Sequence, residues 1–135
     1  KNKINMTTFN SNIIEKVAEG NGDKLLLTER GSSFGYNRLV SDMTSIPIMQ
    51  DFGVPVIFDA THSVQRPGGL GKTTGGAREL IPTLAKAAVA AGCNGVFMEV
   101  HDDPNNAKSD AASQWPLEKL DQLLKSLNRV KQAVL

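Results

Sequence analysis

Short apolar segments alternate along this chain with longer segments of helical periodicity. The apolar runs are KLLLTE at 24–29, PVIFDA at 55–60 and GVFMEV at 95–100. Each has the length of a strand, and the last two are rich in Val, Ile and Phe, which is typical of strands buried on both faces of a sheet. We therefore predict three strands, with KNKINM at 1–6 as a candidate fourth.

Helical patterns occupy the segments around these strands. NSNIIEKVAEG at 10–20 opens with a candidate asparagine cap and ends at a glycine. RELIPTLAKAAVAAG is rich in alanine and ends at Gly92, and Pro82 fits only the first turn of such a helix. The segment 116–135 repeats leucine and valine at i, i+3, i+4 and i+7, which predicts an amphipathic helix.

The expected order is helix–strand–helix–strand–helix–strand–helix, with strand starts about 30 to 40 residues apart. This order indicates repeated βα units on a parallel sheet, and hence the α/β class. An open doubly wound sheet and a TIM (β/α)8 barrel share it. Because a barrel takes ~250 residues, a chain of 135 residues would supply about half of one.

Composition narrows the function classes. The chain is 40% hydrophobic and 21% charged, as in a soluble globular protein, and its formal net charge is +1. This balance gives no electrostatic case for binding nucleic acid or an anionic membrane. No apolar run approaches the ~18 residues of a membrane-spanning helix, and no signal-peptide pattern opens the chain. A single cysteine, Cys93, excludes a disulfide framework, so we expect a cytoplasmic protein.

The segment PGGLGKTTGG at 67–76 resembles a phosphate-binding loop. That motif needs a glycine at position 66, where the chain has Arg66, and a start directly after a strand. Pro67 also lacks the backbone N–H that a phosphate cradle uses. We therefore disfavour nucleotide binding and predict a long, mobile loop over residues 66–77 that acts as a lid on an active site.

Polar side chains follow the carboxyl end of each predicted strand. In α/β proteins this edge carries the active site, because the βα loops converge there. Three successive strands that end in this way favour an enzyme. The residues concerned are Glu29 and Arg30, Asp59 and His62, and Glu99 and His101.

Three polar residues at the strand ends and in the last loop form a candidate metal site: His62, Glu99 and Asp110. One imidazole and two carboxylates suit a divalent ion such as Zn²⁺, Fe²⁺ or Mn²⁺. A carboxylate inside an apolar strand, as we expect for Glu99, needs a partner. The alternatives are a hydrogen-bonded histidine at the edge of the core for His62 and a turn cap for Asp110.

Arg30 is a candidate for binding an anionic substrate. Its planar guanidinium matches carboxylate and phosphate oxygens, and the glycine and serines that follow leave room for a small anion. The alternative is a surface ion pair with Glu29.

Three segments together resemble one known family: LTERGSSFGYNRLVSDM, VIFDATHSVQRPGG and GVFMEVHDDPNNAKSDAASQWPL. They are similar to the 3-deoxy-D-manno-octulosonate 8-phosphate (KDO-8-phosphate) synthases, which share a superfamily with the 3-deoxy-D-arabino-heptulosonate 7-phosphate (DAHP) synthases. The similarity runs from about residue 12 to the final helix. SFGYN is typical of the octulosonate branch, whereas EVHDDP occurs across the superfamily.

The resemblance implies a single TIM-barrel domain, of which residues 1–135 are the C-terminal half, with its last three to four βα units. It implies condensation of phosphoenolpyruvate with D-arabinose 5-phosphate in lipopolysaccharide precursor synthesis, with release of phosphate. It also implies a cytoplasmic homotetramer. The alternatives are a DAHP synthase-like condensation with erythrose 4-phosphate, and an inactive half-barrel fragment.

Site residues are carried over from the resemblance by position. Arg30 is similar to the family's phosphoenolpyruvate-binding arginine, Gln65 to a glutamine near the sugar phosphate, and Lys1 to a substrate-binding lysine. His62, Glu99 and Asp110 are similar to three metal ligands, His62 and Asp110 being also catalytic candidates. Cys93 does not occupy the place of the family's fourth ligand, and we expect it to pack at a helix–strand junction. The stretch KSDAAS favours the metal-dependent branch.

Overall fold

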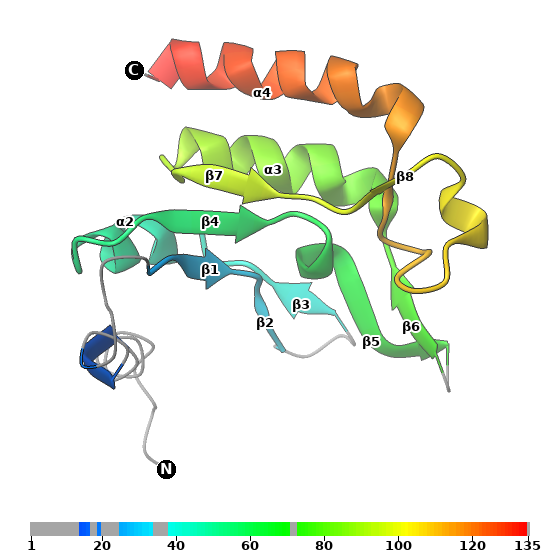
Figure 1. The fold of residues 1–135 in the computed structure, drawn as a ribbon, viewed down its shortest axis with the longest axis horizontal. Coiled ribbons are helices and arrows are strands. Elements are labelled where there is room, and N and C mark those ends of the chain that lie inside the picture. Colours follow the sequence, from blue (N-terminus) through cyan, green and yellow to red (C-terminus); the bar gives the residue numbers. More distant parts are fainter. Residues whose placement is uncertain (1–13, 17–18, 20–24, 34–37, 71–72, 135) are drawn as a thin grey trace.

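The chain folds as an α/β unit around a short parallel sheet. In the computed structural model, the sheet has the strand order β1-β4-β7, and a helix follows each of its strands (Figure 1). The strands are β1 (Leu27–Glu29), β4 (Val56–Asp59) and β7 (Gly95–Phe97). The structure describes residues 14–16, 19, 25–33, 38–70 and 73–134.

Both pairs of neighbouring strands are parallel. Thr28 of β1 lies opposite Ile57 of β4, and Phe58 of β4 lies opposite Val96 of β7. The helices that follow the three strands are α2 (Ser45–Gln50), α3 (Ile81–Ala90) and α4 (Leu120–Val134). This arrangement confirms the predicted α/β class and the predicted repeat of strand and helix.

Short elements fill the connections at the carboxyl ends of the strands. Two antiparallel pairs and one parallel pair join there: β2 (Ser32–Ser33) with β3 (Leu39–Val40), β5 (Gln65–Leu70) with β6 (Thr73–Gly76), and β8 (Val100–His101) with β9 (Trp115–Pro116). Among the described residues, four single turns of 3-10 helix accompany them: His62–Val64, Arg78–Leu80, Pro104–Asn106 and Leu117–Lys119.

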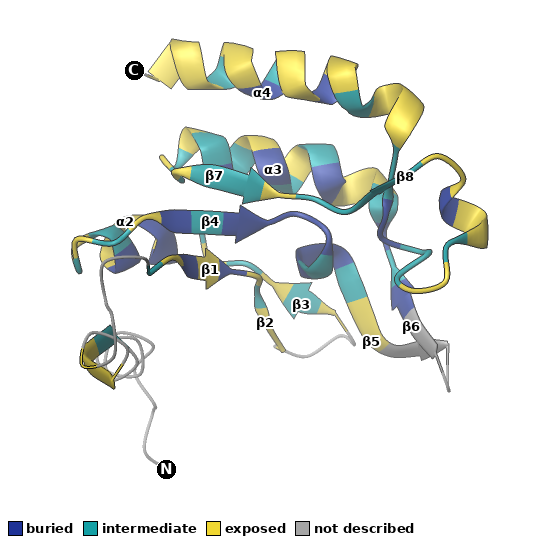
Figure 2. Cartoon of the chain, viewed as in Figure 1, coloured by how far each residue is buried: buried dark blue, intermediate teal, exposed yellow. Residues whose placement is uncertain are grey.

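The core lies between the sheet and the helices. Val56 and Phe58 of the central strand are fully buried, as is Ile81 of α3 (Figure 2). Helix α4 packs along α3 and buries Leu123 and Leu127 while its outer face is exposed. The predicted amphipathic helix is therefore confirmed.

Strand β7 differs from the prediction of burial on both faces. Phe97 is 45% exposed and Val96 only half-buried. Within the described residues β7 is an edge of the sheet, so one side of it has no neighbouring strand. The predicted segment 95–100 also divides, because Val100 leaves the sheet and pairs with Trp115.

The glycine-rich segment 67–76 also differs from its prediction as a loop. Its described residues belong to an antiparallel hairpin in which Gln65 pairs with Gly76 and Leu70 with Thr73. Strand hydrogen bonding therefore replaces the strand-to-helix turn of a phosphate-binding loop. Residues 71–72, which include the lysine of that motif, lie outside the described residues.

The helices begin and end close to the predicted positions. Pro82 lies in the first turn of α3, and Gly92 follows its end with φ +90°. A helix between β1 and β4 was expected, but the sequence did not predict where it begins or ends. The helix found there, α2, has only six residues and an internal proline, Pro47, so it shows little helical periodicity. Of the expected helix at 10–20, residues 14–16 and 19 are helical, and the KNKINM strand and Lys1 lie outside the described residues.

Among the helices that the structure describes, none combines the length and apolar character needed to cross a membrane.

Candidate metal and substrate site

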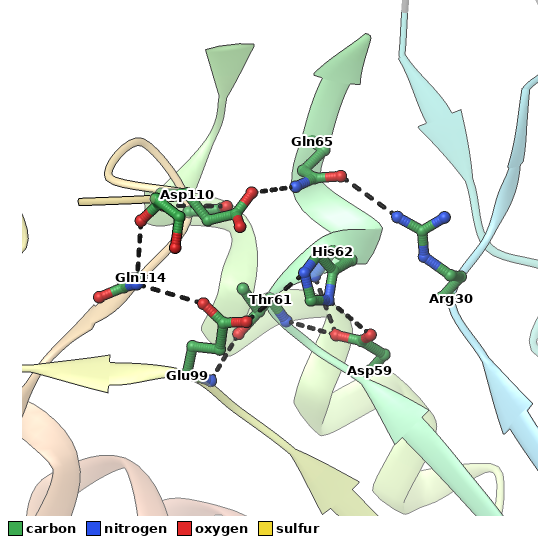
Figure 3. A network of polar contacts seen from close by, with 10 residues as sticks. Arg30, Asp59, Thr61, His62, Gln65, Glu99, Asp110 and Gln114 are labelled. Carbon is green, nitrogen blue, oxygen red and sulfur yellow. Dashed lines mark hydrogen bonds and ion pairs between the residues drawn. The ribbon is translucent and has the colours of Figure 1, made fainter. Parts of the chain in front are cut away.

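Polar side chains from all three strands of the sheet meet at its carboxyl edge. Arg30 follows β1, His62 follows β4 and Glu99 follows β7, while Asp110 comes from the segment between Asn106 and β9 (Figure 3). The predicted convergence at this edge is therefore confirmed for these residues.

The orientation of His62 is fixed by Asp59, the last residue of β4. Asp59 Oδ2 lies 2.7 Å from His62 Nδ1, and its Oδ1 accepts hydrogen bonds from the backbone N–H groups of Thr61 and His62 at 3.1 and 2.9 Å. Asp59 is 7% exposed. A buried carboxylate beside Nδ1 favours the tautomer that carries its proton there, which leaves the Nε2 lone pair free for a ligand.

Nε2 of His62 faces the carboxylate of Glu99. The distance from Nε2 to Glu99 Oε1 is 3.6 Å, and the His62 side chain is 22% exposed. The ring also stacks on Phe97, with 6.1 Å between the ring centroids.

Glu99 lies just beyond β7, so its predicted place inside an apolar strand is wrong, and its side chain is 29% exposed. Its backbone N–H donates to Thr61 Oγ1 at 2.7 Å, and Gln114 Nε2 donates to its Oε2 at 3.2 Å. Sequence reasoning missed Thr61 and Gln114, because neither the apolar pattern nor local spacing relates them to Glu99.

Asp110 directs its carboxylate toward the same place. Its Oδ1 accepts a hydrogen bond of 2.5 Å from Gln65 Nε2. Its backbone oxygen, rather than its side chain, closes the following turn by accepting from Ser113 N and Gln114 N at 2.8 and 3.0 Å. The turn-cap alternative for the side chain is therefore wrong. Asp110 has φ +49°, a left-handed conformation that aspartate tolerates better than most residues.

The donor set fits a divalent metal ion. Ligand atoms of His62, Glu99 and Asp110 all lie within 4.8 Å of one another. Tetrahedral zinc at ~2.0–2.2 Å from each ligand would bring these atoms to roughly 3–3.5 Å, which small side-chain rotations can supply. Two carboxylates offset the charge of the ion, and three protein ligands leave a position open for water or substrate.

His101, also expected at this edge, has a different role in the described structure. Its Nδ1 accepts a hydrogen bond of 2.9 Å from Asp103 N and lies 3.0 Å from Asp102 Oδ1. It therefore holds the turn after β8.

Gln65 connects Arg30 with Asp110. Arg30 Nη2 donates to Gln65 Oε1 at 3.2 Å, while the amide nitrogen of Gln65 donates to Asp110. Glu29 is 5% exposed and accepts hydrogen bonds from Gly31 N and Ser45 Oγ, both at 2.8 Å. The alternative of a Glu29–Arg30 pair on the surface is therefore wrong.

The segment that carries Asp110 rests on β6 and the turn after it. Arg78 Nη2 donates to the Ala111 carbonyl. A Cβ added to Gly76 would come within 2.7 Å of the Ala112 carbonyl oxygen, so only glycine allows this approach. The hairpin thus supports the Asp110 turn as well as supplying Gln65.

Cys93 lies between α3 and β7, half-buried against the core, and the predicted packing at a helix–strand junction is confirmed. Burial raises the pKa of its thiol, while a backbone hydrogen bond with Gly95 and the charge of Lys131 oppose the rise.

Comparison with known sequences identifies the family. The profile of the DAHP synthetase I family matches residues 2–135. The chain belongs to the DAHP synthetase I family. Its relatives include 2-dehydro-3-deoxyphosphooctonate aldolases of three bacteria.

The relative from Nitratidesulfovibrio vulgaris strain DP4 is 59% identical over 115 residues, which are 85% of this chain and 42% of the relative. That from Protochlamydia amoebophila strain UWE25 is 59% identical over 113 residues, 84% of this chain and 41% of the relative. That from Hydrogenovibrio crunogenus is 50% identical over 122 residues, 90% of this chain and 44% of the relative. The chain thus spans less than half the length of these relatives.

Proposed function

We propose that this chain is the C-terminal half of a TIM (β/α)8-barrel synthase domain that condenses phosphoenolpyruvate with D-arabinose 5-phosphate. The products would be 3-deoxy-D-manno-octulosonate 8-phosphate and phosphate. The observation that carries the proposal is the meeting of His62, Glu99 and Asp110 at the carboxyl edge of a parallel sheet. Relatives at 50–59% identity named for 2-dehydro-3-deoxyphosphooctonate support the eight-carbon product over condensation with erythrose 4-phosphate.

Substrate binding is assigned to the basic and amide side chains of the site. Both substrates are anions that repel each other, so a cation fixed between them lowers the free energy of their encounter. Arg30 offers a planar fork to phosphoenolpyruvate, and Gln65 holds that fork at 3.2 Å while facing the sugar phosphate. Lys1, outside the described residues, is a further proposed substrate ligand.

His62, Glu99 and Asp110 would hold a divalent Zn, Fe or Mn ion. Such an ion supplies Lewis acidity for the aldehyde or a positioned water. Asp59 would keep the proton on His62 Nδ1, so that the lone pair of Nε2, which faces Glu99, is free to bind the ion. In the proposed reaction C3 of phosphoenolpyruvate attacks the aldehyde, water adds at C2, and phosphate leaves with cleavage of its C–O bond.

The β5–β6 hairpin is proposed to close over the substrates and exclude water. It begins at Gln65, whose side chain already contacts Arg30 and Asp110, so a movement of the hairpin would act directly on the site. A cytoplasmic homotetramer that serves lipopolysaccharide precursor synthesis completes the proposal.

The test is release of phosphate from phosphoenolpyruvate in the presence of each aldose phosphate, on protein whose intact mass has been measured. We expect turnover with arabinose 5-phosphate, little with erythrose 4-phosphate, and loss of both activity and bound metal in His62→Ala. Faster turnover with erythrose 4-phosphate, or a fully active His62→Ala protein with unchanged metal content, would overturn the proposal. If this sequence is part of a polypeptide as long as its relatives, inactivity of that whole polypeptide with both aldose phosphates would also overturn the proposal.

A further inference from the structure

A cavity beside the candidate metal site has Gln65 among its lining residues. Its volume is about 280 Å³, and it opens between β3, the turn after β4 and the start of α3. Gln65 is the one residue of the candidate site that also lines this cavity; its neighbours there come from three separate segments. The lining residues are Arg38, Leu39, Val40, Ser41, Ser63, Val64, Gln65, Arg66, Ala77, Leu80, Thr83 and Leu84.

The charge of the cavity is positive. Arg38 and Arg66 both line it, and none of its described lining residues is acidic. Both arginines are exposed, so their guanidinium groups reach a ligand without losing their hydration entirely. Two guanidinium groups without a carboxylate among the lining residues favour a carboxylate or phosphate ligand.

Two serine hydroxyls in the lining have unused hydrogen-bonding capacity. Ser63 is 2% exposed, and among the described residues its Oγ has no hydrogen-bond partner. The Oγ of Ser41 is likewise buried and without a partner in the described part of the chain. Burying a hydroxyl without a partner is unfavourable, so each is expected to find its partner in a ligand.

Apolar side chains cover the remainder of the cavity. Leu80 and Val40 are 42% and 41% exposed, and Leu39 and Leu84 lie beside them in the lining. An apolar wall with a few polar groups on one side is the usual composition of a small-molecule site. The volume suits a compound of about one ring.

We propose that this cavity binds a small organic anion whose carboxylate or phosphate group contacts Arg38, Arg66 and the two serine hydroxyls. An apolar body of the ligand would lie against Val40, Leu80 and Leu84. The inference does not rest on the proposed synthase activity, because none of these residues holds the candidate metal ion or is assigned to a substrate.

The test compares three probes with the same ring: phenyl phosphate, benzoate and the neutral benzyl alcohol. Binding to the purified protein is followed by calorimetry and by the NMR signals of the leucine and valine methyl groups and of the His62 ring. We expect saturable binding of an anionic probe, at least tenfold tighter than benzyl alcohol, with shifts of the Val40 and Leu84 methyls. Phenyl phosphate and benzoate together decide which anionic group is preferred.

Two variants and a matched control complete the test. Arg66→Gln should weaken binding of the anionic probe by about tenfold, and Ser63→Ala by about fivefold, as expected for loss of one charge-assisted or one neutral hydrogen bond. Arg129→Gln removes the same charge from an exposed position on α4 and should leave binding unchanged. Equal binding of benzyl alcohol, an equal effect of Arg129→Gln, or shifts confined to the His62 ring would each overturn the proposal.

Discussion

Asp59 Oδ2 lies 2.7 Å from His62 Nδ1, and this contact turns His62 Nε2 toward Glu99. An asparagine in place of Asp59 could still accept from the backbone N–H groups of Thr61 and His62. Its amide nitrogen, however, would donate to Nδ1 and so favour the proton on Nε2, which removes the lone pair that a metal needs. We expect Asp59→Asn to lower affinity for zinc or manganese 10- to 100-fold.

The measurement is metal affinity by competition with a chromophoric chelator, together with thermal unfolding without metal. Asp51→Asn is the control, because Asp51 is an exposed aspartate at the end of α2. Unchanged affinity in Asp59→Asn, or an equal loss in the control, would show that Asp59 does not position the histidine.

Asp110 has a left-handed backbone conformation and a carboxylate that faces the candidate metal site, and two substitutions can test these two features separately. Asparagine tolerates φ +49° nearly as well as aspartate, whereas alanine at such a position costs about 1 kcal/mol. We expect Asp110→Asn to retain thermal stability and lose most of the metal affinity, and Asp110→Ala to lose both. Chemical denaturation and metal titration of the two variants measure the two effects.

Asp103→Asn serves as the control, since Asp103 is an exposed aspartate at the start of a nearby 3-10 turn with φ −132°. If Asp110→Asn bound metal as tightly as the unmodified protein, its carboxylate would not be a ligand.

The sequence predicted those parts of the site that depend on strand ends. Three apolar runs located β1, β4 and β7, and parallel pairing then required the residues after them, such as Arg30 and His62, to share one edge. Asp110 was predicted from its residue type and from the resemblance, because in the sequence it lies well beyond the end of β7. Its orientation depends on tertiary contacts with Gln65 that no periodicity encodes.

The hairpin at 65–76 could not be predicted for a related reason. Glycine and proline weaken the intrinsic preference for strand, so the segment reads as a loop. Its structure depends instead on pairing between Gln65 and Gly76 and on the close approach of Gly76 to Ala112. The same dependence on neighbours explains why β7, rich in apolar residues, exposes Phe97 at the edge of the sheet.

Gly76 and Gly95 allow a paired test of this support. An added Cβ at Gly76 would come within 2.7 Å of a backbone oxygen, whereas at Gly95 it would meet the terminal methyl of Ile57 at 3.0 Å. Because backbone cannot move aside as a side-chain end can, we expect Gly76→Ala to destabilise the fold by ~1–3 kcal/mol and Gly95→Ala by less.

Metal affinity distinguishes the two glycine variants further. Gly76→Ala should displace the turn that carries Asp110 and weaken metal binding, while Gly95→Ala should bind metal normally. Equal effects of the two substitutions on both unfolding and metal binding would contradict the proposed support.

Burial of Cys93 gives stability a dependence on pH. Its raised pKa means that the folded chain keeps the thiol proton at pH values where the unfolded chain, with a thiol pKa of ~8.5, has lost it. The resulting stabilisation is complete below the thiol pKa of the unfolded chain. It declines as pH rises from that pKa through the higher pKa of the folded chain. We therefore expect the difference in unfolding free energy between the unmodified protein and Cys93→Ala to shift in favour of Cys93→Ala between pH 7.5 and 9.5.

Lys131 supplies the control for this interpretation, because its charge opposes the rise in the Cys93 pKa. Removing the charge in Lys131→Gln raises that pKa further, so the shift between pH 7.5 and 9.5 should become larger in the Lys131→Gln background. Urea unfolding of the four proteins at both pH values measures the effect. A difference that does not change with pH, or that moves in favour of the cysteine, would mean that the thiol ionises at least as readily in the folded chain as in the unfolded one.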